Sequence, residues 1–375
     1  MPTVVSDTTM VAAIDGTAGA AMVSESNIVA ATAARICADL ADPQTINAAR
    51  NEQWKAPLWR ALEEAGLTLA WVPDKLGGAG AGLDDGFAII GIAGRYALAV
   101  PLAETLLAAW LLSRAGIAAP RGAMTVAPTR PRDRIELGTD GTLRGRASVI
   151  PFAKDTQHIA VTVDGNKAAA IVLVKTADCR IGGGENLAGE TANIVVFDGA
   201  KVLHSAPAPA GFDASSLLLM GAVVRSVAIA GALETILALS VRYANERVAF
   251  ERPIGKFQAV QQNLARLAGE TAAALAAAGS AADTIAQSET LNDTLLLEAA
   301  AAKIRTGEAA AEGASIAHQV HGAIGFTQEH ILHRFTLRML SWRDDFGSES
   351  YWAGKLGAMI AKRGSNNFWP LVASR

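Results

Sequence analysis

The chain has 375 residues, 51% of them hydrophobic and 18% charged, which is enough for two or three packed units with a large core. Its 33 basic and 36 acidic side chains leave a formal charge of −3, and this balance excludes the basic excess typical of nucleic-acid binders. Two cysteines, Cys37 and Cys179, cannot complete a thiolate metal site, and we interpret both as free thiols of a reducing cytoplasm.

The N-terminal segment carries no targeting pattern. Its first 34 residues contain no Lys or Arg, whereas secretory and transit peptides need basic residues there. Residues 1–26 are small and polar without a helical or strand period, so we expect a flexible tail. Arg225 and Glu234 interrupt a long apolar run, and the sequence therefore favours a soluble protein that does not interact with a membrane.

Residues 27–117 have the apolar spacing of helices. Ile28, Ile36 and Leu40 follow this spacing, and Asp42-Pro43 and the glycine-rich stretch Gly77–Gly82 interrupt it. We expect an N-terminal helical domain here.

Residues 118–213 change to a period of two. His158–Val163 alternates and residues 168–174 return as a second apolar strand, so Asp164-Gly165 predicts a hairpin turn. Further Asp-Gly turns are expected at Asp140-Gly141 and Asp198-Gly199. The pattern predicts a middle antiparallel β-sheet or barrel domain.

Residues 214–375 are dominated by helix formers. Ser216–Phe250, Phe257–Gln287 and Thr294–Gly322 are long compared with an average helix of about 11–12 residues, which favours a four-helix bundle. The predicted fold class is therefore α+β and multidomain, in the order helical domain, sheet domain, helical bundle.

Two glycine-rich stretches resemble nucleotide motifs but fail on their residues. Gly77–Gly82 does not fit G-x-G-x-x-G because Leu83 stands at the last glycine position, so a loop is expected. Gly184–Thr191 has the spacing of a phosphate loop but places Glu190 where a lysine must meet phosphate.

The histidines do not indicate a metal site. His318 and His321 are three residues apart, as are His330 and His333, but no carboxylate lies at a ligand spacing from either pair. No G-x-S-x-G motif supports hydrolase chemistry.

The stretch from Arg242 to Gln262 predicts a helix, a corner at Pro253 and a second helix. Arg247, Arg252 and two aromatic rings at such a corner suit a phosphate-bearing planar ligand. An ordinary solvated corner between two bundle helices is the alternative.

Several motifs in this chain resemble those of the acyl-CoA dehydrogenase family. The family's R-x-A-F-G-x-P-I-x-x-F-Q corner appears as Arg247-Val-Ala-Phe250-Glu-Arg-Pro253-Ile-Gly-Lys-Phe257-Gln258. Its Q-x-x-G-G-x-G-F motif appears as Gln319-Val-His-Gly322-Ala-Ile-Gly-Phe326, and VPEELGGAG as residues 72–80. The resemblance covers about residues 27–360. It implies the acyl-CoA dehydrogenase fold and FAD-dependent α,β-dehydrogenation of an acyl-CoA thioester, a CH-CH oxidoreduction of lipid metabolism.

The family's catalytic base is missing at both positions where the resemblance places it. One branch uses the Glu of a Y-E-G-T motif, where this chain has Phe346-Gly347-Ser-Glu. Another uses a Glu near the start of the long helix, where this chain has Gly221. The nearby Asp345 and Glu349 are interpreted as surface or N-cap carboxylates, with Asp345 as the weak candidate for an alternative base, so the catalytic residue stays unassigned.

The resemblance implies that the flavin lies at a subunit interface. The ring-binding regions of the sheet domain are not retained, since they read Val126-Ala-Pro-Thr-Arg-Pro-Arg-Asp133 and Ile150-Pro-Phe-Ala-Lys154 here. The residues that the family lends to a neighbouring subunit's FAD are present, namely Arg247, Phe250, Gln258, Gln319 and Gly322.

One substitution at the corner opposes this assignment. Glu251 replaces the family's glycine after the corner Phe, which places a negative charge near the diphosphate, and Arg252 could offset it.

These observations predict a subunit of a hetero-oligomeric α2β2 enzyme that shares FAD at an interface with a related subunit. The resemblance implies an acyl-CoA substrate and an electron-transfer flavoprotein as acceptor. Two alternatives stay open: a self-sufficient homomeric enzyme with Asp345 as base, and a non-catalytic helical interaction protein.

Overall fold

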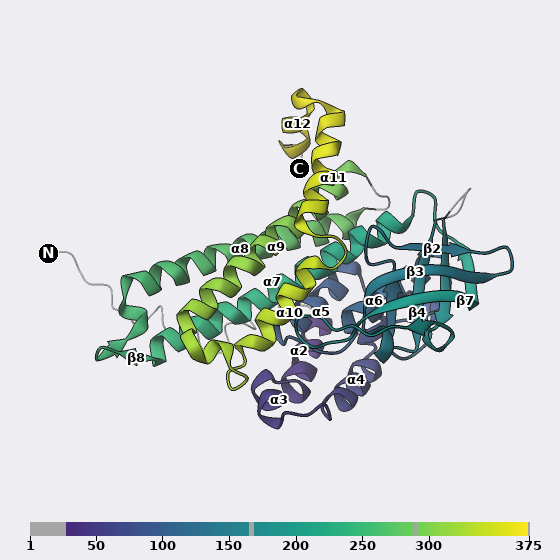
Figure 1. The fold of residues 1–375 in the computed structure, drawn as a ribbon. Helices are drawn as coiled ribbons and strands as arrows, with labels where there is room; N and C mark the ends of the chain where they lie inside the picture. The colour runs from purple at the N-terminus through teal and green to yellow at the C-terminus, as the bar shows by residue number, and fades with distance from the viewer. Residues whose placement is uncertain (1–27, 165–168, 289–291, 374–375) are drawn as a thin grey trace.

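The computed structural model describes residues 28–164, 169–288 and 292–373. The tail expected at residues 1–26 and the turn residue Gly165 lie outside these ranges. Helices, sheet and helical bundle follow one another as predicted, in the acyl-CoA dehydrogenase fold. Figure 1 shows the sheet at one end of the long helical bundle and the β8 corner at the other, with α11 and α12 rising from the side.

The N-terminal helices pack beside the sheet and the bundle. They are α2 (Ile28–Leu40), α3 (Pro43–Ala49), α4 (Lys55–Glu64), α5 (Leu83–Arg95) and α6 (Leu102–Arg114). The break predicted at Asp42-Pro43 is the start of α3, because the Asp42 carboxylate accepts a hydrogen bond from the Thr45 amide at 2.8 Å. The glycine-rich stretch before α5 is a loop, as expected.

The middle region forms a mixed sheet in the order β1-β4-β5-β7-β3-β2, with β6 paired to β7. Only the β1–β4 pair is parallel among the described strands. The strands are β1 (Met124–Ala127), β2 (Arg134–Leu137), β3 (Thr142–Pro151), β4 (His158–Val163), β5 (Ala170–Lys175), β6 (Arg180–Ile181) and β7 (Ala192–Pro207).

The expected turns differ in outcome. Asp140-Gly141 joins β2 to β3, as predicted. The turn predicted at Asp198-Gly199 is wrong, because both residues lie inside β7 at a register shift opposite Leu143 and Arg144. Gly199 has a φ of +75°, which a glycine adopts without strain, so this Asp-Gly pair forms a β-bulge and not a hairpin.

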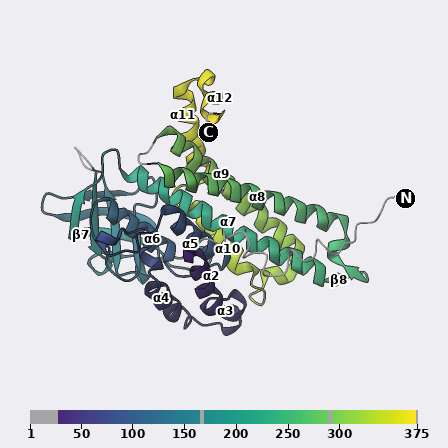
Figure 2. The ribbon, with the colours of Figure 1, turned by 180° about the vertical axis from the view of Figure 1, so that it is seen from behind.

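The C-terminal region is a bundle around one buried helix, α7, which is seen from both sides in Figures 1 and 2. The helices are α7 (Ala214–Glu246), α8 (Gln258–Gln287), α9 (Asp293–His321), α10 (Leu332–Asp344), α11 (Glu349–Arg363) and α12 (Phe368–Ala373). Among the described helices, α7 is long and apolar enough to cross a membrane, but 94% of that apolar window is buried inside the molecule. It is therefore a core helix.

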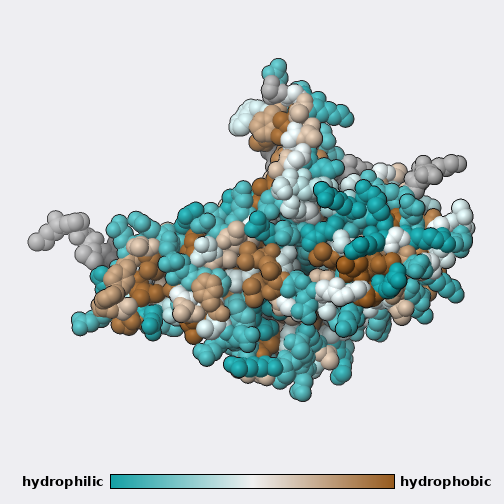
Figure 3. Space-filling view, in the orientation of Figure 1, coloured by the Kyte–Doolittle hydropathy of each residue, from teal (hydrophilic) through white to brown (hydrophobic). Residues whose placement is uncertain are grey.

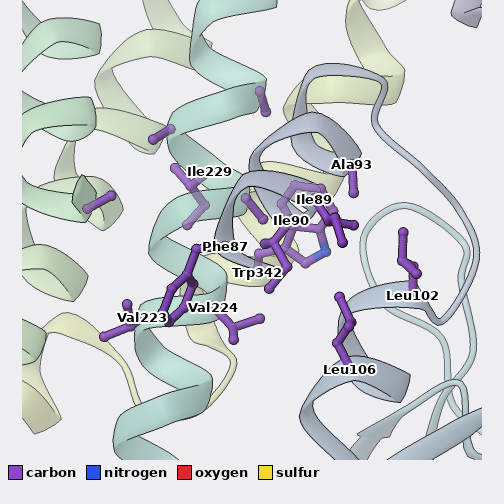
Figure 4. Close-up of a cluster of buried hydrophobic side chains, with 14 of the residues drawn as sticks. Phe87, Ile89, Ile90, Ala93, Leu102, Leu106, Val223, Val224, Ile229 and Trp342 are labelled. Atoms are coloured by element: carbon purple, nitrogen blue, oxygen red, sulfur yellow. The ribbon is translucent and has the colours of Figure 1, made fainter. Parts of the chain in front are cut away.

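Helices α5 and α7 pack closely in this core. Figure 4 shows Phe87 and Ile90 of α5 beside Val223, Val224 and Ile229 of α7. Glycines allow the backbones to approach, since a Cβ added to Gly231 would lie 2.2 Å from the carbonyl oxygen of Gly91.

We therefore predict that Gly231→Ala lowers the free energy of unfolding by about 1–3 kcal/mol, because the new methyl group forces α5 and α7 apart. Chemical denaturation measures this change. Gly279→Ala on α8 is the control, since nothing lies within 4 Å of its added Cβ, and it should be neutral or raise stability by about 0.5–1 kcal/mol. Equal effects of the two substitutions would contradict the close packing.

Candidate functional site

The first candidate region is the junction between the sheet and the bundle, where residues 129–133, the middle of α7 and residues 344–347 meet. The two positions at which a base is missing come together here. A Cβ added to Gly221 would lie 2.3 Å from the ring of Phe346, which is itself 1% exposed. Gly347 follows with a φ of +99° and is packed against Tyr351 and Trp352. An aromatic ring fills the space that a carboxylate on α7 would need.

Four charged residues, here called the charge cluster, occupy the rest of this junction: Glu104 of α6, Arg130 after β1, Arg225 of α7 and Asp345 after α10. Arg225 is buried, and its guanidinium donates to a Glu104 oxygen and, at 3.0 Å, to Asp345 Oδ2. Arg130 lies 3.6 Å from Asp345 Oδ1 and donates to the Asp344 carbonyl oxygen. Burial raises the pKa of Glu104, and the charge of Arg225 opposes that rise.

Asp345 is buried at 7% exposure, so its interpretation as a surface or N-cap carboxylate is wrong. One of its oxygens faces Arg225 and the other faces Arg130. A carboxylate that neutralises two guanidinium groups is a poor proton acceptor for a substrate carbon, because protonation would break both interactions.

Lys303 of α9 contacts the same junction at the end of α10. Its ammonium group is fully buried and donates to the carbonyl oxygens of Trp342, at 3.1 Å, and Arg343. Burial lowers its pKa to about 8. These bonds hold the last turn of α10, from which Asp345 and Phe346 follow.

Sequence reasoning missed Glu104, Arg225 and Lys303 as parts of one site. The available signal was Arg225, a single charge inside an apolar helical run. Its partners could not be predicted, because Glu104 and Asp345 each lie more than 100 residues away in the chain. Only a small cavity of about 90 Å³ is left nearby, lined by Trp110, Arg114, Phe212, Met220 and Ile285 among others.

The second candidate region is the distal face, defined by Arg247, Phe250, Gln258, Gln319 and Gly322. The structure brings all five together at the end of the bundle that lies away from the sheet, and all five are exposed. The corner is a short hairpin of β8 (Val248–Ala249) and β9 (Arg252–Pro253). Figure 3 shows apolar side chains gathered at this end of the molecule.

The tip of this corner extends into solvent. Phe250 is 89% exposed with a φ of +51°, and Glu251 follows with a φ of +64°. The guanidinium of Arg252 stacks over the ring of Phe257 at 4.2 Å. Arg252 is thus held against an aromatic ring at the position where it would offset the charge of Glu251.

A cleft of about 640 Å³ lies beside Arg247, and its other lining residues are Tyr243, Glu246, His321, Ala323, Ile324 and Thr327. The His321 ring is stacked on Tyr243 with centroids 4.5 Å apart. Its Nδ1 lies 2.8 Å from the Ala317 carbonyl oxygen, and Nε2 is buried without a hydrogen-bond partner among the described residues. This orphaned nitrogen borders a cleft large enough for a ligand.

Three neighbouring histidines, His318, His330 and His333, each have a hydrogen bond to a protein group, although His318 Nδ1 is also buried without a partner among the described residues. His318 Nε2 lies 3.0 Å from Thr336 Oγ1, and His333 Nδ1 lies 2.7 Å from the His330 carbonyl oxygen. Within the described ranges, no group of three metal-ligating side chains forms around these histidines.

Comparison with known proteins agrees with this arrangement. The family described as "Acyl-CoA dehydrogenase, C-terminal domain" matches residues 211–349. Acyl-CoA dehydrogenase IpdE2 of Mycobacterium tuberculosis is 28% identical over 318 residues, covering 84% of this chain and 90% of that protein. Acyl-CoA dehydrogenase FadE27 of the same organism is 26% identical over 335 residues, covering 83% of this chain and 90% of its own length. The C-terminal domain of the acyl-CoA dehydrogenase family thus matches this chain, and most of the chain is similar to members of that family.

Two solved structures of acyl-CoA dehydrogenase complexes have the same fold. A variant of the Tcur3481-Tcur3483 steroid ACAD gives a TM-score of 0.78 at 25% identity and covers 89% of this chain and 97% of its own. The ChsE4-ChsE5 complex from Mycobacterium tuberculosis gives a TM-score of 0.78 at 23% identity and covers 93% of this chain and 98% of its own. This chain is thus homologous to subunits of heteromeric steroid acyl-CoA dehydrogenases.

The two candidate regions differ in how well they fit FAD, the family's cofactor. At the junction, Phe346 occupies the space beside Gly221, and Glu104, Arg225, Asp345 and Arg130 are engaged with one another, so the described residues of this region do not fit a flavin ring. At the distal face, Arg247 is exposed without a carboxylate partner in the described part of the chain, so its guanidinium can donate to a phosphate. The unpartnered Nε2 of His321 is an acceptor, because Nδ1 donates to the Ala317 carbonyl oxygen, and it suits a donor group of a ligand and not a phosphate oxygen. This face fits a phosphate-bearing tail, and the contacts of its five residues with a cofactor stay a prediction.

The buried ring of His321 predicts a pH-dependent stability for this protein. Burial lowers its pKa from 6.5 to about 4, so the unfolded chain binds more protons than the folded chain between these pH values. We predict that the free energy of unfolding falls by up to about 3 kcal/mol from this residue as the pH falls from 6.5 to 4.

Unfolding of His321→Phe across this pH range tests the prediction, because phenylalanine keeps the ring contact with Tyr243 but cannot be protonated. The pH dependence should be weaker in this variant and unchanged in His204→Gln, whose side chain is exposed on β7. An identical acid dependence in all three proteins would exclude His321 as its source.

Proposed function

We propose that this chain is one subunit of a heteromeric acyl-CoA dehydrogenase, in an α2β2 arrangement, and that it lends its distal face to the FAD of a related partner subunit. The partner supplies the carboxylate that removes the α-proton and the loops that hold the flavin ring. FAD, when bound there, accepts the hydride that leaves the β-carbon of the acyl-CoA. A bulky acyl-CoA such as a steroid side chain is the proposed substrate class, with an electron-transfer flavoprotein as acceptor and the cytoplasm as location.

One observation carries this proposal, namely the separation of the two halves of a flavin site. The β8–β9 corner, which follows Arg247 and flanks Phe250, lies at the end of the bundle opposite the sheet (Figure 1), and we therefore infer that it contacts the FAD of another subunit and not a cofactor at its own junction. The exposed rings of Phe250 and Phe326, 89% and 72% exposed, suit contact with another subunit. The two heteromeric complexes of the same fold support this arrangement.

The first test is the flavin content of the complex formed with a related subunit encoded nearby. We expect the co-expressed complex to carry flavin in half of its subunits and the chain alone to carry little. Arg247→Ala should weaken flavin retention by about tenfold or more, because a charged hydrogen bond to phosphate contributes about 1.5–3 kcal/mol.

The matched control is Arg35→Ala, which removes an exposed arginine from α2. Flavin absorbance per complex after dialysis measures the effect. Loss of the same amount of flavin from both variants, or full flavin occupancy and turnover in the isolated chain, would contradict the proposal.

A self-sufficient enzyme with Asp345 as base is the alternative, and Asp345→Asn separates the two. Under our proposal the variant complex keeps its turnover, while the free energy of unfolding falls by about 3 kcal/mol because Arg225 and Arg130 lose a buried carboxylate. The control is Asp344→Asn, whose side chain is exposed. Loss of turnover in Asp345→Asn, with stability like that of the control, would favour the alternative.

A further inference from the structure

The charge cluster joins parts of the chain that belong to three different regions. Glu104 comes from the N-terminal helices, Arg130 from the sheet region, and Arg225 and Asp345 from the bundle. Arg130 is the member that links the sheet to the bundle, since it contacts both Asp345 and the Asp344 carbonyl oxygen. The cluster therefore lies where the relative position of the sheet and the bundle is decided.

The loop that carries Arg130 is itself held in place. Asp133 accepts hydrogen bonds from the amides of Thr129, at 3.2 Å, and Arg130, at 3.0 Å, and also from the Ser148 amide at 2.9 Å. Thr129 Oγ1 donates to the Ser148 carbonyl oxygen at 3.2 Å. These hydrogen bonds fix the loop to β3. They therefore also fix the position of Arg130 relative to Asp344 and Asp345.

The charges of the cluster balance within the protein. Two guanidinium groups face two carboxylates, and each carboxylate is within reach of at least one guanidinium group. Buried charges are stable when paired in this way, and the fully buried ammonium of Lys303 lies beside the cluster on the carbonyl oxygens of Trp342 and Arg343. The aromatic rings of Trp342 and Phe346 lie 5.9 and 5.8 Å from the Arg225 guanidinium and cover it further.

A second buried ion pair acts in the same direction. Arg338 Nε of α10 lies 2.6 Å from Glu190 Oε1 in the loop before β7, and both side chains are buried. The sheet is therefore attached to α10 and the residues after it at two separate places.

We propose that the charge cluster is an ionic lock that closes this chain's own junction and holds the sheet on the bundle without a cofactor, with Arg130 as its positioning residue. The lock concerns the chain's own junction and goes beyond the proposed function, because it holds whether or not the distal face contacts a partner's FAD.

Hydrogen exchange in the co-expressed complex tests the lock through Arg130→Ala. Arg225 keeps both of its carboxylate partners in this variant, so the core stays paired. Amide exchange at residues 129–130, 132–133 and 343–347 should rise by about tenfold relative to wild type, and the melting temperature should fall by about 2–4 °C. Arg132→Ala is the matched control, since Arg132 is exposed on the same loop.

Two further measurements make the outcome decisive. Arg130→Lys should restore part of the protection, because an ammonium group still faces Asp345. Flavin content of the Arg130→Ala complex should match wild type, because the partner's flavin site is separate. Exchange in Arg130→Ala equal to that in Arg132→Ala would overturn the lock, as would an isolated wild-type chain that binds added FAD at the junction.

The flavin count distinguishes failure of the lock from failure of the proposed function. A wild-type complex without flavin would overturn the proposed function and leave the exchange comparison between Arg130→Ala and Arg132→Ala valid. Normal flavin content with no change in exchange would overturn the lock alone.

Discussion

The buried guanidinium of Arg225 is the constraint around which the junction is built. A charge inside the buried part of α7 is stable only if carboxylates reach it, and Glu104 of α6 and Asp345, which follows α10, do so. This requirement fixes the path of the chain after α10, and it places Phe346 over Gly221. The packing of Phe346 on Gly221 and the pairing of Arg225 with Asp345 therefore depend on the same path of the chain.

The same arrangement gives the two candidate regions different surfaces. Its junction is filled by its own side chains, whereas the distal face leaves aromatic and cationic groups in solvent. A monomer that exposes rings such as Phe250 and Phe326 gains nothing from them by itself, and exposed apolar groups near charged ones are typical of interaction surfaces. The region that retains the family's motifs is therefore exposed, and the region that lacks them is closely packed.

The order of the regions and most helices could be predicted from periodicity, because apolar spacing at long helices such as α7–α9 is a strong local signal. The error at Asp198-Gly199 has a local cause, since the same dipeptide forms a turn or a bulge and the neighbouring strand decides which. The distal residues were accessible to motif comparison because they lie close together in two short segments. The charge cluster was not, because Glu104, Arg130 and Asp345 are brought together only by the tertiary fold.

The contact between Phe346 and Gly221 limits which substitutions could place a carboxylate at this junction. A carboxylate cannot return to position 221 by one substitution, because the aromatic ring already occupies its volume. A return at position 347 would place a side chain on a backbone with a φ of +99°, which only glycine tolerates well. Each of these single substitutions would therefore strain the folded structure. Neither position can therefore gain a carboxylate by one unstrained substitution, which under the proposed function leaves proton abstraction to the partner subunit.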